Sequence, residues 1–229
     1  MSATKSRMPQ RQVDPSAQLQ GIDASAGSFA QLPALRSLIE AKGCGLLGHG
    51  TRVAGIACAV GARAGLPKSE LELLATAAEV HDIGKLGVPD RILLKAGRLT
   101  DAEYSVIQQH PEIGRDLLRL AGVRGNLLDV VLCHHERWDG DGYPFRRRTT
   151  ESPLAARILS LADTVDAMAS DRPYRASQPM TRIVGELERC SGTQFDPNVV
   201  DLFLGLARGI RSDGWVDRIA ATGATQLAA

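Results

Sequence analysis

Residues 70–85 read Glu-Leu-Glu-Leu-Leu-Ala-Thr-Ala-Ala-Glu-Val-His-Asp-Ile-Gly-Lys, and this stretch decides the fold. Leucine and alanine recur at helical spacing, which predicts an apolar helix that stops at Gly84. In helical geometry Lys85 shares a face with His81 and Asp82. An imidazole, a carboxylate and an ammonium group together suit a metal–phosphate site. A helix end whose charged side chains lie in solvent is the alternative that this stretch alone leaves open.

Helical patterns also dominate the chain on both sides of this stretch. Apolar residues recur every three or four positions, and no segment shows the sustained alternation of a β-strand. Thr100 with Glu103, and Ser69 with Glu72, have the spacing of capping boxes. The predicted helices cover about residues 32–39, 49–64, 70–83, 101–109, 111–120, 126–136, 153–170, 179–190 and 197–207. We therefore expect an all-α fold, a compact bundle of about seven or more helices.

The overall composition is that of a globular chain with little net charge. The 229 residues are 44% hydrophobic and 23% charged, and the net charge is +1. This balance gives no bulk attraction to nucleic acid polymers or to a membrane surface, and no apolar run is long enough for a membrane span. The four cysteines are scattered without a CxxC pair, which favours reduced, buried thiols in a cytoplasmic protein.

The composition changes near both ends of the chain. Residues 1–28 mix Ser, Gln, Ala, Gly and Pro without apolar periodicity, so we expect a flexible N-terminal arm. Residues 29–210 contain all the predicted helices, including a short one at the start, and are expected to form one domain. The stretch 211–229 is small and polar, and we expect it to be a dispensable C-terminal tail.

The five histidines stand at the predicted ends of helices. His134 and His135 are adjacent, and neighbouring side chains on a helix diverge by about 100°, so the pair could reach two metals, or one metal and a substrate oxygen. Pro111 pushes His110 out of helical geometry, and His49 begins a helix. A lone histidine is more often a core or surface residue than a metal ligand, so each of them taken singly decides nothing.

Seven short motifs follow one another between about His49 and Leu206. They are His49-Gly-Thr-Arg-Val, His81-Asp-Ile-Gly-Lys, Gln109-His-Pro-Glu-Ile-Gly, His134-His-Glu-Arg-Trp-Asp-Gly-Asp-Gly-Tyr-Pro, Asp163 within Leu-Ala-Asp, Asp171-Arg-Pro-Tyr-Arg and Gly192-Thr-Gln-Phe-Asp-Pro. In this order they resemble the HD-GYP family, the bacterial cyclic di-GMP phosphodiesterases among the HD metallohydrolases. The resemblance implies an HD-type helical bundle with a Gly-Tyr-Pro loop beside its metal site.

The resemblance assigns a metal-binding role to every histidine. The implied ligands are His49, His81, Asp82, His110, His134, His135 and Asp163. Asp82 is the implied bridge between two metals and, together with Lys85, an implied catalytic residue. Helical periodicity alone places Asp163 and Asp166 on a solvated face. The resemblance overrides this placement for Asp163 and only weakly for Asp166.

The Gly-Tyr-Pro loop is the expected place of substrate contact. Two glycines and Pro144 make residues 138–144 a turn that presents its aromatic side chains. Trp138 is equally consistent with a packed loop anchor. The substrate-binding residues that the resemblance implies are Tyr143, Arg172 and Arg175. Guanidinium groups suit phosphates and guanine bases because they form forked hydrogen bonds and stack on rings.

Some positions depart from the family's pattern. Gly50 stands where a serine is usual, and Arg146–Arg148 replace a stretch that contains Gly and Leu; these arginines could hold an anion or form a solvated basic loop. Glu79 replaces an apolar residue but faces away from the histidine of its helix, so we do not expect a ligand there. Gly45 lies four residues before His49, where relatives with three metals have a glutamate, so we expect two metals.

The resemblance implies metal-dependent hydrolysis of cyclic di-GMP to pGpG, and further to GMP, by a centre of two divalent metal ions. Imidazole and carboxylate ligands without thiolate favour iron or manganese. A diguanylate cyclase-type protein bound through the Gly-Tyr-Pro loop and a second copy of the chain, forming a homodimer, are the candidate protein partners. Two alternatives stay open: hydrolysis of another cyclic dinucleotide, and a catalytically silent signalling module that acts through the same loop.

Overall fold

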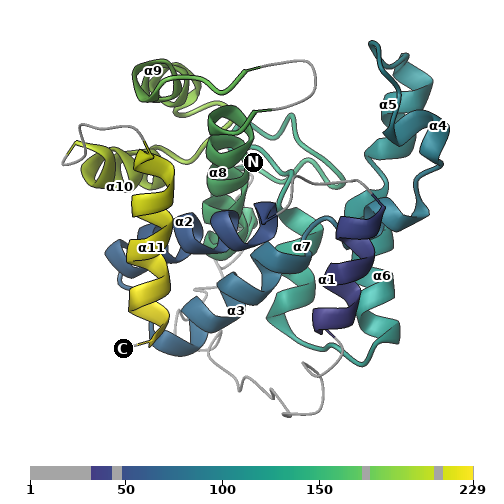
Figure 1. The fold of residues 1–229 in the computed structure, drawn as a ribbon, viewed down its shortest axis with the longest axis horizontal. Helices are drawn as coiled ribbons and strands as arrows, with labels where there is room; N and C mark the ends of the chain where they lie inside the picture. Colours follow the sequence, from purple (N-terminus) through teal and green to yellow (C-terminus); the bar gives the residue numbers. More distant parts are fainter. Residues whose placement is uncertain (1–31, 43–47, 172–175, 209–213, 229) are drawn as a thin grey trace, which may run out of the picture.

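The computed structural model describes residues 32–42, 48–171, 176–208 and 214–228. Within these ranges the regular structure is helical, as predicted (Figure 1). An isolated bridge joins Ser191 to Phe195. The α-helices are α1 (Leu32–Ala41), α2 (His49–Arg63), α3 (Lys68–Val80), α4 (Asp90–Leu93), α5 (Asp101–Ile107), α6 (His110–Leu120), α7 (Asn126–Cys133), α8 (Leu154–Ala169), α9 (Met180–Cys190), α10 (Pro197–Ala207) and α11 (Trp215–Ala228). Two short 3₁₀ helices are η2 (Ile83–Gly87) and η3 (Thr149–Glu151). None of the helices described here is long and apolar enough to cross a membrane.

Helix α2 is the centre of the core. The nine residues from Val53 to Gly61 are all buried, and five of them are alanine or glycine. Such small side chains let neighbouring helices approach closely from several directions. Helices α3, α8 and α11 pack against α2, and Figure 1 shows α2 in the middle of the molecule with α11 on one flank. This packing fixes His49, the first residue of α2, next to α3 and α8.

Helix α3 ends earlier than the sequence predicted. It closes at Val80, and His81 and Asp82 form a turn before η2 begins. Helix α6 packs directly against η2 at this point. A Cβ atom on Gly84 would overlap the carbonyl oxygen of His110, so only glycine fits between the two segments. The glycine therefore brings the start of α6 to the turn that carries Asp82.

One of the two predicted capping boxes is present. The Thr100 hydroxyl accepts a hydrogen bond from the Glu103 N–H, and the Glu103 carboxylate accepts one from the Thr100 N–H at 2.8 Å. The prediction of a box at Ser69 is wrong, because α3 begins at Lys68 after Pro67 and Ser69 already lies inside the helix. Proline at this position holds the extended backbone from which a helix can start.

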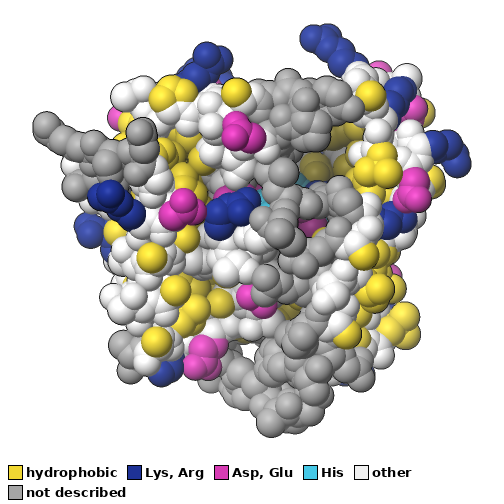
Figure 2. All heavy atoms as spheres, in the orientation of Figure 1, with side chains coloured by type: hydrophobic (Ala, Val, Ile, Leu, Met, Phe, Trp, Pro, Cys, Tyr) yellow, Lys and Arg dark blue, Asp and Glu magenta, His cyan; other side chains and the backbone are white. Residues whose placement is uncertain are grey.

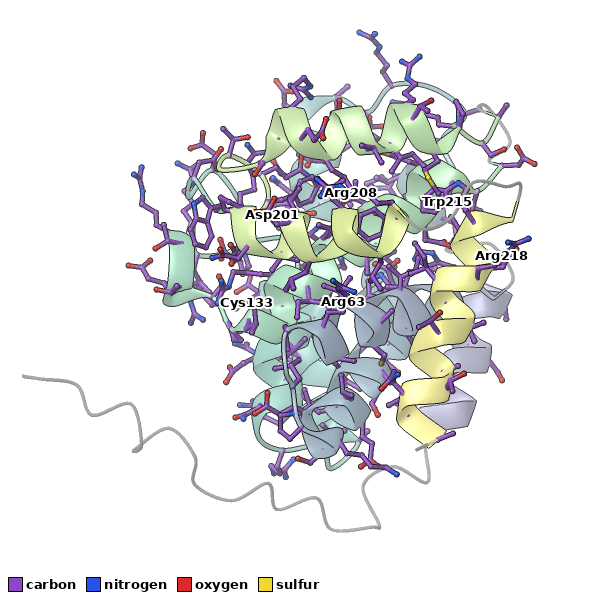
Figure 3. All side chains as sticks on the ribbon, turned by 90° about the vertical axis from the view of Figure 1, so that its left-hand side faces the viewer. Arg63, Cys133, Asp201, Arg208, Trp215 and Arg218 are labelled. Carbon is purple, nitrogen blue, oxygen red and sulfur yellow. The ribbon has the colours of Figure 1, made fainter. Side chains whose placement is uncertain are left out.

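The prediction of a small, polar C-terminal tail is wrong for residues 215–228. They form α11, which packs on α2 and buries Trp215, Val216 and Ile219. A Cβ atom on Gly223 would overlap the carbonyl oxygen of Gly55, so the two helix backbones are in contact there. Figure 3 shows Trp215 at the end of α11 next to α10, where its ring meets that of Phe203 with 6.2 Å between centroids. The predicted arm, residues 1–28, lies outside the described residues.

Candidate metal centre

All five histidines lie at helix ends that meet in one place. His49 and His110 begin α2 and α6, His81 and His134 directly follow α3 and α7, and His135 comes next. Three of these residues are buried, with His134 at 0%, His110 at 1% and His81 at 2% exposure, and His49 and His135 are partly buried. Figure 2 accordingly shows only small patches of histidine near the middle of the displayed face. The helix ends therefore form a buried imidazole cluster.

The structure brings together the seven residues that the sequence predicted as metal ligands. They form two groups, and within each group one ligand atom per residue lies within 4.8 Å of the others. The first group is His49, His81 and Asp163, and the second is Asp82, His110, His134 and His135. Asp82 faces both groups, because its Oδ2 lies 3.4 Å from His81 Nε2 and its Oδ1 lies 3.5 Å from His110 Nε2. Its carboxylate thus lies between the two groups.

Three of the histidines are oriented by main-chain carbonyls. The Nδ1 atoms of His81, His110 and His134 lie 2.7, 2.8 and 2.6 Å from the carbonyl oxygens of the residues three positions earlier. A neutral imidazole that donates from Nδ1 keeps a lone pair on Nε2, so the hydrogen bonds assign the tautomer. All three Nε2 atoms then present lone pairs to the centre of the cluster.

Buried polar atoms of the cluster that lack a hydrogen-bond partner indicate a site for a cation. His81 Nε2 and Asp82 Oδ1 are buried without a hydrogen-bond partner. The Nε2 atoms of His110 and His134 lie 3.3 Å apart, although both Nδ1 atoms already donate to carbonyls, so two lone pairs face each other. Buried acceptors without donors are unfavourable, and a divalent metal that accepts their electron pairs removes this cost. The residues present therefore fit a divalent metal.

The charge states of the second group are those of a metal site. Burial above all lowers the pKa of His134 and His110, and it lowers that of His135 to about 3, so these imidazoles are neutral near pH 7. Burial raises the pKa of Asp82, but Lys85 and His81 outweigh it and hold that pKa well below the usual range. Metals bind neutral imidazole and ionised carboxylate, so the ligands of the second group stand in the form required. In the first group, burial lowers the pKa of His49, but its hydrogen bonds to Asp163 and Asp166 outweigh burial and raise that pKa to about 9, so a metal bound there would have to displace a proton.

Lys85 lies beside the linking carboxylate. Its Nζ is 2.5 Å from Asp82 Oδ2, and its side chain is 20% exposed, whereas Asp82 is almost fully covered. The predicted shared face is present, although the residues occupy a turn and a 3₁₀ helix in place of one α-helix. The ammonium group thus stands between the buried carboxylate and the solvent side of the centre.

Asp166 is a residue of the centre that the sequence placed wrongly. Periodicity put it on a solvated face of α8, yet its side chain is completely buried. Its Oδ2 accepts a hydrogen bond from His49 Nδ1 at 2.7 Å, and its Oδ1 accepts one from Arg52 Nε at 2.6 Å. The available signal was Arg52, a charged residue one turn after His49 that directly precedes the apolar stretch of the same helix. Asp163, the neighbouring carboxylate, lies 3.3 Å from His49 Nε2 and is 22% exposed.

The loop that carries Tyr143 contacts His135, a member of the second group of ligands. The Tyr143 ring stacks on His135 with centroids 4.8 Å apart and an angle of 28°, and the Tyr143 N–H donates to the His135 carbonyl at 3.2 Å. Glu136, which the sequence did not single out, is buried and accepts hydrogen bonds from the N–H groups of Phe145 and Arg147 at 2.7 and 2.9 Å. Burial raises the pKa of the Tyr143 phenol, which therefore remains a hydrogen-bond donor at neutral pH.

The remaining residues from the sequence lie around this centre or outside the described part. Trp138 is half-buried under the Arg157 guanidinium, 5.7 Å from its ring centroid, which favours the packed-anchor alternative. Arg146 and Arg148 are exposed, whereas Arg147 donates to Cys133 Sγ at 3.2 Å. Neither group of candidate ligands includes Glu79. The predicted substrate residues Arg172 and Arg175, and Gly45, lie outside the described residues.

Comparisons with known proteins agree with this architecture. The family model of the HD domain matches residues 33–199. A cyclic di-GMP phosphodiesterase of Thermotoga maritima is 38% identical over 184 residues, which are 80% of this chain and 50% of that protein. The 3′3′-cGAMP-specific phosphodiesterase 2 of Vibrio cholerae is 36% identical over 142 residues, 61% of this chain and 27% of that protein. The chain thus spans half the length of these relatives or less.

A solved structure shares the fold. It is that of Bd1817, an HD-GYP protein from Bdellovibrio bacteriovorus, which superposes with a TM-score of 0.58 at 18% identity over 70% of this chain and 52% of that one. At this identity the likeness concerns the arrangement of helices. Together with the HD domain match and the buried histidine and aspartate cluster, it agrees with the motifs read from the sequence. The chain belongs to the HD domain family.

Proposed function

We propose that the chain is a metal-dependent phosphodiesterase that hydrolyses cyclic di-GMP to pGpG, and further to GMP. The observation that carries this proposal is the pair of ligand groups on either side of Asp82, with buried acceptors that a cation would satisfy. The relative from Thermotoga maritima, which bears this activity in its name, supports the choice of substrate. Hydrolysis of a phosphodiester needs charge compensation at phosphorus, which a pair of cations provides.

The proposed centre holds two divalent ions. His49, His81 and Asp163 would hold one, and His110, His134 and His135 would hold the other, with Asp82 shared. Imidazole and carboxylate donors without a thiolate suit iron or manganese. Cations bound there would neutralise the phosphoryl oxygens and activate water for attack on phosphorus.

Residues of the chain supply the rest of the chemistry. Lys85, next to Asp82, would stabilise the negative charge that develops on the phosphate during cleavage. Tyr143, held by its stacking on His135, would donate a hydrogen bond from its phenol to a phosphate oxygen. Arg172 and Arg175 remain the proposed contacts to the second phosphate or to the guanine bases. Positioning and charge stabilisation account for most of the rate enhancement in such reactions.

A second candidate substrate is 3′3′-cGAMP. The relative from Vibrio cholerae that is specific for it is nearly as similar as the cyclic di-GMP enzyme. Protein purified anaerobically and loaded with manganese or iron should be given equal concentrations of both dinucleotides, and the specificity constant kcat/KM measured for each. We expect the higher value for cyclic di-GMP. A higher value for 3′3′-cGAMP would make that molecule the substrate.

A signalling module without activity is the rival from another class. Such a module would have lost ligands, whereas this chain keeps all seven and gathers them. A diguanylate cyclase-type partner bound through the Gly-Tyr-Pro loop, and a homodimer, remain proposals that are compatible with catalysis. The absence of turnover of any cyclic dinucleotide by protein with bound metal would favour the module.

Replacing Tyr143 with phenylalanine should weaken substrate binding. The change removes the phenolic donor but keeps the ring that stacks on His135, so the loop should stay in place. A hydrogen bond to a charged group is worth about 1.5–3 kcal/mol, so we expect the Michaelis constant to rise by roughly tenfold or more. Steady-state kinetics would measure this, with metal content and thermal unfolding as controls. An unchanged Michaelis constant with a large loss of stability would make Tyr143 a packing residue.

The metal count should be close to two per chain. The structure gathers two groups of ligands, and Gly45 has no side chain to recruit a third ion next to His49. Metal analysis of anaerobically prepared protein would provide the count, and anomalous scattering from a crystal would locate the ions. A reproducible count near three, with an ion next to His49, would show that another residue replaces the missing glutamate.

A further inference from the structure

His49 lacks the support that orients three other histidines of the centre. His81, His110 and His134 donate from Nδ1 to carbonyls in the last turns of α3, α5 and α7, respectively. The last carbonyls of a helix have no partner within the helix, so they are available to a histidine that follows. His49 is the first residue of α2, and the start of a helix presents N–H groups, which cannot accept its proton.

A carboxylate from another helix occupies the corresponding place. Asp166 on α8 accepts the hydrogen bond from His49 Nδ1 at 2.7 Å and is completely buried. The other nitrogen, His49 Nε2, faces Asp163 at 3.3 Å, inside the first group of candidate ligands. An imidazole that donates from Nδ1 to a carboxylate is fixed in orientation and tautomer, and it is a stronger electron-pair donor at Nε2.

Arg52 forms an ion pair with the same carboxylate. Its Nε and Nη2 lie 2.6 and 3.1 Å from the two oxygens of Asp166, and Nη2 also donates to Ser170 Oγ at 3.2 Å. Arg52 lies one turn after His49 on α2, and Asp166 lies one turn after Asp163 on α8. In each of the two helices, a candidate metal ligand therefore lies one turn before a residue of the Arg52–Asp166 ion pair.

We infer that Asp166 is a positioning residue of the metal centre, which fixes His49 for one of the two ions. The inference rests on the proposed metal centre, and it assigns a role to a carboxylate that is not itself among the ligands. Asp166 contributes a buried negative charge and a directed acceptor, which a main-chain carbonyl contributes elsewhere in the centre. Its removal should loosen the ion held by the first group and leave the ion held by the second group in place.

The two partners of Asp166 allow this role to be separated from simple bracing of α2 against α8. Asp166→Asn keeps the shape of the side chain but removes its charge and one hydrogen-bond acceptor. It therefore weakens the contacts of this side chain to both His49 and Arg52. Arg52→Met removes the ion pair but leaves the Asp166–His49 hydrogen bond. If Asp166 acts through His49, Asp166→Asn should lower the affinity for one ion by roughly 10–100-fold, the range for such supporting contacts. Arg52→Met should change that affinity by less than about threefold, within the scatter of changes outside the contact.

The experiment is a titration of chelator-treated full chain with Mn²⁺ alone, followed by the free Mn²⁺ signal in electron paramagnetic resonance. Asp201→Asn, an exposed carboxylate on α10, is the matched control for the loss of a charge. Circular dichroism would verify that each variant is folded. If Arg52 without its carboxylate prevents folding, the double variant Arg52→Met/Asp166→Asn removes both charges and carries the same expectation.

We expect about two ions per chain in the unaltered protein, in the Arg52→Met variant and in the control, and about one in Asp166→Asn at the same free Mn²⁺ concentration. Equal binding by Asp166→Asn would overturn the positioning role. An equal loss in Arg52→Met would also overturn it, because the effect would then come from the contact between helices. If the unaltered chain bound no Mn²⁺, the proposed metal centre itself would fail, and the inference with it.

Discussion

Replacing Asp82 with alanine should abolish both metal binding and catalysis. Its two oxygens face His81 and His110 at 3.4 and 3.5 Å, so the change removes a ligand from both groups at once. Without this carboxylate the two groups lose the anion that lies between His81 and His110. We expect turnover to fall by roughly 1000-fold or more, about 4 kcal/mol of transition-state stabilisation. Metal analysis and an assay of cyclic di-GMP cleavage on the same preparation would measure both effects.

The matched control is Asp116→Ala on α6. That carboxylate is 51% exposed and pairs with its neighbour Arg115, so its loss should change neither metal content nor rate. Lys85→Met offers a second comparison, because it should lower turnover while most of the metal stays bound. Normal metal content in Asp82→Ala would show that the carboxylate does not link the two groups.

Replacing Gly84 with alanine should destabilise the protein severely. The added Cβ atom would overlap the His110 carbonyl oxygen and lie 2.6 Å from the Gly114 nitrogen. Both are main-chain atoms, so no side-chain rotation relieves the overlap, and η2 must move away from α6. Overpacking of this kind costs about 3 kcal/mol or more, and the movement would also separate Asp82 from His110. Urea unfolding monitored by circular dichroism would measure the loss.

Gly97→Ala is the control for this substitution. A Cβ atom at Gly97 would meet no atom within 4 Å, so the free energy of unfolding should change by less than about 0.5 kcal/mol. If Gly84→Ala were as stable as Gly97→Ala and retained its metal, the contact between η2 and α6 would not position the centre.

Helical periodicity in the sequence predicted where most helices lie, but it did not predict that α11 packs on α2. Helices α9 and α10 lie where their apolar stripes indicated, to within one residue. Helix α11 was taken for a polar tail because alanine and glycine look featureless in a sequence. In the folded chain those same small residues allow the backbones at Gly223 and Gly55 to touch. Only the identity of the opposite helix distinguishes a featureless segment from a close packing surface.

In the candidate site, too, local features could be predicted and contacts between distant segments could not. Residues that belong to a local motif, such as His81 with Asp82, could be assigned from the sequence and the family resemblance, and the structure gathers them. Asp166 and Glu136 were not assigned, because each acts on a segment far away in the sequence. A buried carboxylate on a helix looks like a solvated one until its partner is known. For Asp166 that partner is His49, 117 residues earlier in the chain.

The central claim is that this cluster of imidazoles and carboxylates drives phosphodiester cleavage through bound metal. It is tested most directly by measuring pGpG release from cyclic di-GMP with one anaerobic preparation in three states: as purified, after chelation, and after reloading with manganese or iron. The account predicts that activity disappears with the metal and returns in proportion to the metal restored, up to about two ions per chain. Undiminished cleavage by protein shown to be free of metal, or no cleavage by protein with both ions bound, would contradict it.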